Sequence, residues 1–149
     1  LIKMEALVNG YSEGIALDAA GFVSEGSGEN LFLVKKGALY TPPLTASILP
    51  GITRQTVVQL AQEMGIPLVE RSLPREALYT ADEVFFVGTA VEVTPIRSID
   101  RVTVGRGTRG EITTRIQSEY KAITSGHTED RHHWLSLVQE AVPVPGQVG

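Results

Sequence analysis

EVFFV (residues 83–87) decides the fold class of this sequence. After Glu83, the run offers no polar side chain that could face water. A strand of this kind is buried on both faces, as in sheets covered by helices, whereas a strand with one wet face alternates apolar and polar residues. We therefore expect an α/β or α+β fold in which helices cover the sheet.

Short extended segments separated by turn residues indicate further strands on both sides of this run. Two of them form a predicted hairpin around Asp18-Ala19-Ala20-Gly21, and two others are joined by Lys36-Gly37. The expected strands are 14–17, 22–24, 30–34, 38–40 and 66–69, and 91–99 is expected to be extended.

Two long helices are predicted by apolar residues at helical spacing. The first begins at Gly51-Ile52-Thr53 after a loop over 41–50, ends at Gly65, and carries Val57, Leu60, Ala61 and Met64 on one face. The second spans 112–123, with Ile112, Ile116, Tyr120 and Ile123 on one face. Shorter helical segments are expected over 1–8, over 74–78, and at Trp134, Leu135 and Val138.

Composition is that of an ordinary globular domain, with 149 residues of which 42% are hydrophobic and 20% charged. The net charge of −4 argues against a nucleic-acid partner, which needs a basic surface. The absence of cysteine excludes disulfides and cysteine-zinc sites and suits a cytoplasmic location. The apolar runs are too short to predict a membrane span. We expect one domain over 1–138 and a flexible tail over 139–149.

The beginning of the sequence predicts that a preceding part is absent. The first residue is Leu1, and 1–8 has the pattern of the second half of a helix that ends at Asn9-Gly10. Lys3 and Glu5 exclude a secretory signal in this segment.

The helix start at Leu49-Pro50-Gly51-Ile52-Thr53-Arg54 is a candidate anion site. The first amides of a helix have no internal partner, and the helix dipole attracts negative charge to that end. Thr53 adds a hydroxyl donor, so a phosphate group fits. The alternative is an ordinary helix cap in which Thr53 satisfies its own backbone.

Two further segments are candidates for ligand binding. The loop Ser24-Glu25-Gly26-Ser27-Gly28-Glu29-Asn30 carries two carboxylates among small residues, and a carboxylate fixed there can pair with a protonated ring nitrogen. Gly88-Thr89-Ala90 follows a buried strand, and ligands of α/β sheets sit at strand ends. The alternatives are a solvated loop and a strand that simply ends at glycine.

His132-His133, beside Glu129 and Asp130, is a weak metal candidate. Adjacent histidines point to different sides of a helix, so we expect a charged surface helix there and no metal site.

Taken together, four segments resemble the fold type IV pyridoxal-phosphate enzymes, the class IV aminotransferases, and most closely the branched-chain aminotransferases. The segments are SEGSGENLF (24–32), LPGITR (49–54), LYTADEVF (78–85), and Gly88-Thr89-Ala90 with Glu92-Val93-Thr94-Pro95. Their order and spacing match across about 1–138, and Glu92-Val93-Thr94-Pro95 favours the branched-chain group.

The resemblance implies roles for named residues in binding pyridoxal 5'-phosphate. Glu25 would keep the pyridine nitrogen protonated, and Leu49 would lie against the ring. Gly51, Ile52 and Thr53 would form the phosphate site with Thr89, and Thr89 and Ala90 would meet the substrate carboxylate. Glu29 and Asn30 would support the loop.

The resemblance also implies a catalytic lysine, the residue that binds the cofactor as a Schiff base. In the family it precedes the helix that here begins at Leu1, so we expect it upstream of this sequence, along with a small N-terminal domain. Lys3, Lys35, Lys36 and Lys121 do not occupy its position.

The implied function of the complete protein is transamination between leucine, isoleucine or valine and 2-oxoglutarate, with this chain as the large C-terminal domain. The family pairs large domains, so a homo-oligomer is expected. D-amino acid aminotransferase, (R)-amine transaminase and aminodeoxychorismate lyase, which share the fold, remain alternatives. A non-catalytic binding or assembly module that kept the fold is the alternative of another class.

Overall fold

The computed structural model describes residues 1–136. Its helices are α1 (Ile2–Val8), α2 (Ile52–Glu63), α3 (Glu76–Tyr79) and α4 (Glu111–Thr124). Its strands are β1 (Ile15–Leu17), β2 (Val23–Gly26), β3 (Asn30–Lys35), β4 (Ala38–Thr41), β5 (Leu68–Glu70), β6 (Glu83–Gly88), β7 (Glu92–Pro95), β8 (Ser98–Ile99) and β9 (Val102–Thr103). None of the helices in this range is long and apolar enough to cross a membrane.

A five-stranded sheet in the order β5-β4-β3-β6-β7 forms the centre of the fold. The β4–β5 pair is parallel and the other pairs are antiparallel, so the sheet is mixed. Two-stranded pairs, β1 with β2 and β8 with β9, lie beside it. The mixed sheet with flanking helices confirms the expected fold class.

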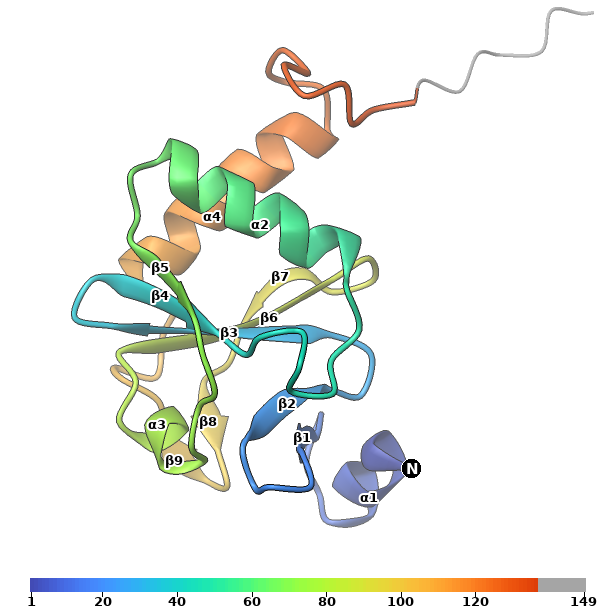
Figure 1. The fold of residues 1–149 in the computed structure, drawn as a ribbon, viewed down its shortest axis with the longest axis vertical. Coiled ribbons are helices and arrows are strands. Elements are labelled where there is room, and N and C mark those ends of the chain that lie inside the picture. The colour runs from blue at the N-terminus through green and yellow to red at the C-terminus, as the bar shows by residue number, and fades with distance from the viewer. Residues whose placement is uncertain (137–149) are drawn as a thin grey trace, which may run out of the picture.

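The sheet is buried on both faces, as the EVFFV run predicts. Phe85 and Val87 belong to the core under α2 and α4, while Val84 and Phe86 belong to the core on the other face. Figure 1 shows α2 and α4 crossing one face, with α3 and the β8–β9 pair on the other.

Most expected elements are confirmed, with shifts of a few residues at their ends. The predicted strand 66–69 begins at Leu68, because the amide of Ile66 is used to bond Ala61 and close the end of α2. The predicted final helical turn is wrong at Trp134 and Leu135, which lie in a loop. Val138 and the predicted tail over 139–149 lie outside the described residues.

Glu83, the first residue of β6, holds the start of α4. Its carboxylate accepts hydrogen bonds from the amides of Ile112 (3.1 Å) and Thr113 (2.8 Å) and from the Thr113 hydroxyl (2.6 Å). A carboxylate at a helix N-terminus also complements the helix dipole. Gly110 precedes the helix because a Cβ there would lie 2.0 Å from Glu83 Cδ.

Replacing Glu83 by glutamine is expected to destabilise the fold by about 1–3 kcal/mol, since the amide cannot accept hydrogen bonds at both positions. Chemical denaturation measures the change in the free energy of unfolding. Glu111→Gln, an exposed change in the first turn of the same helix, is the control. Equal effects of the two changes would contradict the capping role of Glu83.

Candidate functional site

The three candidate segments meet at one end of the central sheet, where β3 begins and β6 ends. Asn30 pairs with Val87 across these strands. A Cβ added to Gly88 would lie 3.3 Å from the carbonyl oxygen of Gly28, so the β6–β7 turn touches the β2–β3 turn. A Cβ added to Gly51 would lie 2.1 Å from Asn30 Oδ1, so the start of α2 also lies against β3. Figure 1 shows all three turns on the same side of the molecule.

The start of α2 leaves hydrogen-bond donors free. Gly51 is the N-cap in an extended conformation, and no side chain caps the helix. The Gly51 amide bonds the carbonyl of Leu49 (2.9 Å), but the amides of Ile52, Thr53 and Arg54 have no acceptor among the described residues. The hydroxyl of Thr53 has none there either, although Thr53 is only 6% exposed. The alternative of a self-satisfied cap therefore fails.

Glu25 lies within β2, and not in a loop between strands as the sequence suggested. Its Oε2 accepts hydrogen bonds from Asn30 Nδ2 (2.8 Å) and from the amide of Leu49 (3.0 Å). Oε1 receives no hydrogen bond from residues 1–136, so one carboxylate oxygen is held and the other is available to a ligand.

The remaining predicted residues present an open surface. Leu49 is 71% exposed and Ile52 81% exposed, so both apolar side chains are accessible to a ligand beside the start of α2. Thr89 and Ala90 are exposed in the β6–β7 turn. The Thr89 hydroxyl makes no hydrogen bond with any residue that the structure describes, so it is available as a donor.

Arg54 is a structural residue whose role sequence reasoning missed. Its side chain is 4% exposed and donates to the carbonyl of Pro42 (3.0 Å) and to Glu70 Oε2 (2.7 Å). It fastens the first turn of α2 to the loop before the helix and to β5. No local pattern marks this partnership, because Glu70 is distant in the sequence.

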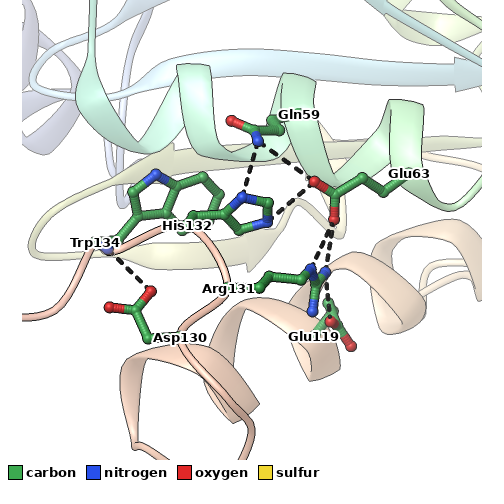
Figure 2. A network of polar contacts seen from close by, with 7 residues as sticks. All are labelled: Gln59, Glu63, Glu119, Asp130, Arg131, His132 and Trp134. Atoms are coloured by element: carbon green, nitrogen blue, oxygen red, sulfur yellow. Dashed lines mark hydrogen bonds and ion pairs between the residues drawn. The ribbon is translucent and has the colours of Figure 1, made fainter.

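The predicted surface helix around the histidine pair is wrong, because His132 lies in a turn and His133 in a loop. No cluster of metal-ligating side chains occurs within residues 1–136. His132 stacks on Trp134 (4.2 Å between ring centroids), and its ring nitrogens lie 3.0 Å from Gln59 Nε2 and 3.0 Å from Glu63 Oε1, as Figure 2 shows.

Charged contacts hold the same segment against α2 and α4 (Figure 2). Arg131 bridges Glu63 (2.6 Å) and Glu119 (3.1 Å), and its hydrogen bond lowers the pKa of Glu63. The amides of Leu135 and Trp134 bond the carboxylate of Asp130 and lower its pKa. These contacts hold residues 130–135 as a docked loop, because the amides of Trp134 and Leu135 bond the Asp130 carboxylate and the Arg131 and His132 side chains bond α2 and α4.

The lysines of the chain lie in other contacts. Lys3 pairs with Glu13 (2.7 Å) and Lys35 with Asp82 (3.5 Å). Lys35 is the last residue of β3, at the end opposite to Asn30, and Lys36 follows it, while Lys121 lies in the last turn of α4.

Known proteins resemble this chain in both sequence and structure. Residues 1–99 match the family described as Amino-transferase class IV. Branched-chain-amino-acid aminotransferase of Escherichia coli (strain K12) is 54% identical over 140 residues, covering 94% of this chain and 45% of the relative. A crystal structure of the E. coli enzyme superposes with a TM-score of 0.91, covering 94% of this chain and 47% of that one. The chain thus spans about half the length of these relatives.

Two further solved structures of similar proteins contain ligands. The T.th. branched-chain amino acid aminotransferase, complexed with N-(5'-phosphopyridoxyl)-L-glutamate, is 41% identical with a TM-score of 0.87, over 91% of this chain and 46% of that one. The Thermobaculum terrenum enzyme in its PLP-form is 43% identical with a TM-score of 0.83, over 86% and 42%. With the match over residues 1–99, these likenesses show that the chain belongs to the class IV aminotransferase family.

Proposed function

We propose that this chain is the cofactor-binding large domain of a pyridoxal-phosphate-dependent branched-chain amino acid aminotransferase. The observation that carries the proposal is the convergence of free helix amides, a half-satisfied carboxylate and a free threonine hydroxyl at one end of the sheet. Together these groups match a ligand that has an anionic end and a protonated ring nitrogen.

The phosphate end fits the start of α2. Unpaired amides at Ile52 and Thr53, with the Thr53 hydroxyl, offer converging donors at the positive end of a helix dipole. Gly51 lets the backbone approach closely, and Thr89 adds a second hydroxyl from the β6–β7 turn. These residues would hold the phosphate without a charged side chain.

The ring end fits Glu25 and Leu49. The free oxygen of Glu25 would accept a hydrogen bond from the protonated ring nitrogen, and the exposed side chain of Leu49 would cover a ring face. When bound, pyridoxal phosphate draws electrons from the substrate Cα, so that this carbon can lose and regain its proton. A negative charge at Glu25 keeps the ring nitrogen protonated, which strengthens that withdrawal.

The substrate pair is proposed as a branched-chain L-amino acid (leucine, isoleucine or valine) and 2-oxoglutarate. The names of the E. coli and T.th. relatives support the branched-chain group over the D-amino acid, amine and lyase alternatives, and the phosphopyridoxyl-glutamate complex of the latter supports the second substrate. Exposed backbone at Thr89 and Ala90 would meet the substrate carboxylate.

The catalytic lysine is proposed to lie in a part of the complete protein outside this chain. The four lysines here are in other contacts or on elements away from the site, and the relatives are about twice as long. On the family resemblance we also propose a homo-oligomer formed through the large domains. The cysteine-free sequence supports a cytoplasmic location.

Glu25→Gln is expected to lower turnover of the complete enzyme by about a hundred- to a thousandfold, the usual loss when one fixed charge or donor is removed from an active site. Cofactor binding should persist, because the phosphate contacts remain. Steady-state kinetics with leucine measure the change, and Glu29→Gln, in the turn that follows β2, is the control. Near-normal turnover of Glu25→Gln would contradict the role of this carboxylate.

Thr53→Ala is expected to weaken pyridoxal phosphate binding about ten- to a hundredfold, since a hydroxyl hydrogen bond to a charged group contributes roughly 1.5–3 kcal/mol. Thr89→Ala should have an effect of the same kind. Thr56→Ala, one turn further along α2, is the control because its hydroxyl bonds the carbonyl of Ile52. Unchanged affinity in both the Thr53 and the Thr89 variants, measured by cofactor titration, would refute the phosphate site.

Borohydride reduction of the cofactor-loaded complete protein, followed by peptide mapping, is expected to label a lysine outside this chain. The physical reason is that covalent catalysis needs a lysine fixed beside the reacting carbon. Stoichiometric labelling of Lys3, Lys35, Lys36 or Lys121 would contradict the proposal.

A further inference from the structure

Asn30 occupies the point where the three segments of the site meet. Its side chain is buried, at 6% exposed. Its backbone opens β3 and pairs with Val87, so it lies beside the strand that leads into Gly88 and Thr89. A buried polar side chain needs hydrogen-bond partners, and those partners show what the residue holds together.

The amide nitrogen of Asn30 links two segments. Nδ2 donates to Glu25 Oε2 (2.8 Å) on β2 and to the carbonyl of Leu49 (3.0 Å) in the loop before α2. The amide of Leu49 also donates to Glu25 Oε2 (3.0 Å), which closes a triangle of three residues. Both partners of Nδ2 are acceptors, so a flipped amide would place oxygen against oxygen, and the network fixes its orientation.

The amide oxygen of Asn30 faces the other functional element. Oδ1 lies against Gly51, where a Cβ would come within 2.1 Å, so the N-cap of α2 is seated directly on this side chain. Asn30 thus contacts both Glu25, the carboxylate proposed to face the ring, and the start of α2, whose amides are proposed to bind the phosphate.

We infer that Asn30 is a positioning residue that holds the Glu25 carboxylate and the start of α2 at a fixed distance from each other. This distance would match the distance between the ring nitrogen and the phosphate of one ligand. This rests on the proposed function, because it takes the two groups to bind opposite ends of the same cofactor. Asn30 touches neither the cofactor nor the substrate in this scheme, and it acts through Glu25 and Leu49.

An uncharged donor is required at this position. Aspartate has the same shape but would place a second carboxylate about 2.8 Å from Glu25, and both ionise at high pH. At low pH the pair binds one proton, which restores both a donor toward Glu25 and the net charge of the original pair. Leucine is similar in size but cannot donate at any pH.

This difference defines an experiment on the complete enzyme with N30D, N30L and E25Q. The control is N9D, a change at the other asparagine of the sequence, which is exposed and bonds only the carbonyl of Glu5. Turnover, pyridoxal phosphate affinity of the apo-protein and apo-protein thermal stability are measured from pH 5 to 9, each relative to the unmodified enzyme at the same pH.

N30D is expected to lose about ten- to a hundredfold in turnover at high pH and to recover as the pH falls. N30L should show a loss of similar size that does not depend on pH, and N9D should match the unmodified enzyme. Cofactor affinity should fall in both Asn30 variants. A role confined to stability would lower the thermal transition but leave the relative pH profile of N30D flat.

The E25Q variant tests the role of Glu25, and the Asn30 variants test the positioning role. Normal turnover in E25Q overturns the role of Glu25 and with it the inference about Asn30. A second outcome is that E25Q loses turnover while the relative pH profile of N30D is flat, or while both Asn30 variants bind the cofactor normally. That outcome overturns only the positioning role of Asn30, and the proposed function stands.

Discussion

The antiparallel pairing of β3 with β6 is the constraint on which the rest of the structure depends. Its register runs from Asn30 opposite Val87 to Val34 opposite Glu83. A slip of one strand by one residue would turn each of its side chains to the opposite face of the sheet, and so into the wrong core. The same register places Asn30 beside the turn that carries Thr89, and it places Glu83 under the start of α4. One pairing therefore sets both the candidate site and the anchoring of a core helix.

The starts of α2 and α4 lie at opposite ends of this strand pair and differ in how their first amides are hydrogen-bonded. Both α2 and α4 begin after an extended glycine that provides no side-chain cap. At α4, Glu83 enters the space that a Cβ on Gly110 would fill and accepts the amides of Ile112 and Thr113. At α2, the corresponding amides have no acceptor within residues 1–136. The same local sequence signal thus gives a helix end capped by Glu83 in one place and, among the described residues, an uncapped one in the other.

The sequence predicts well the features that depend on local pattern. The EVFFV run predicts a strand buried on both faces, and the spacing of Val57, Leu60 and Ala61 predicts the buried side of α2, because periodicity alone determines which face is apolar. The positions of the candidate site segments, at a helix start and a strand end, follow from the same element boundaries.

The remaining features depend on contacts between distant residues, which no local pattern contains. Glu83 is recognisable as a strand residue but not as the cap of a helix that begins far along the chain. Residues 130–135 have helix-like spacing, yet Arg131 and His132 find partners on α2 and α4 that a local helix would not give them. Glu25 lies in a strand because β1 pairs with β2 as far as Gly26, a register that the glycines of 26–28 do not reveal.

The open start of α2 is maintained by packing. An ordinary N-cap residue such as serine or aspartate stabilises a helix by about 1 kcal/mol relative to alanine, so leaving the position uncapped has a cost. No such residue fits here, because its Cβ would lie 2.1 Å from Asn30 Oδ1. The helix is held instead by buried Val57 and Leu60 and by Arg54, which bonds Pro42 and Glu70. These contacts stabilise α2 from its side, so the helix start can lack a cap among the described residues, and its first amides stay available to the ligand proposed above.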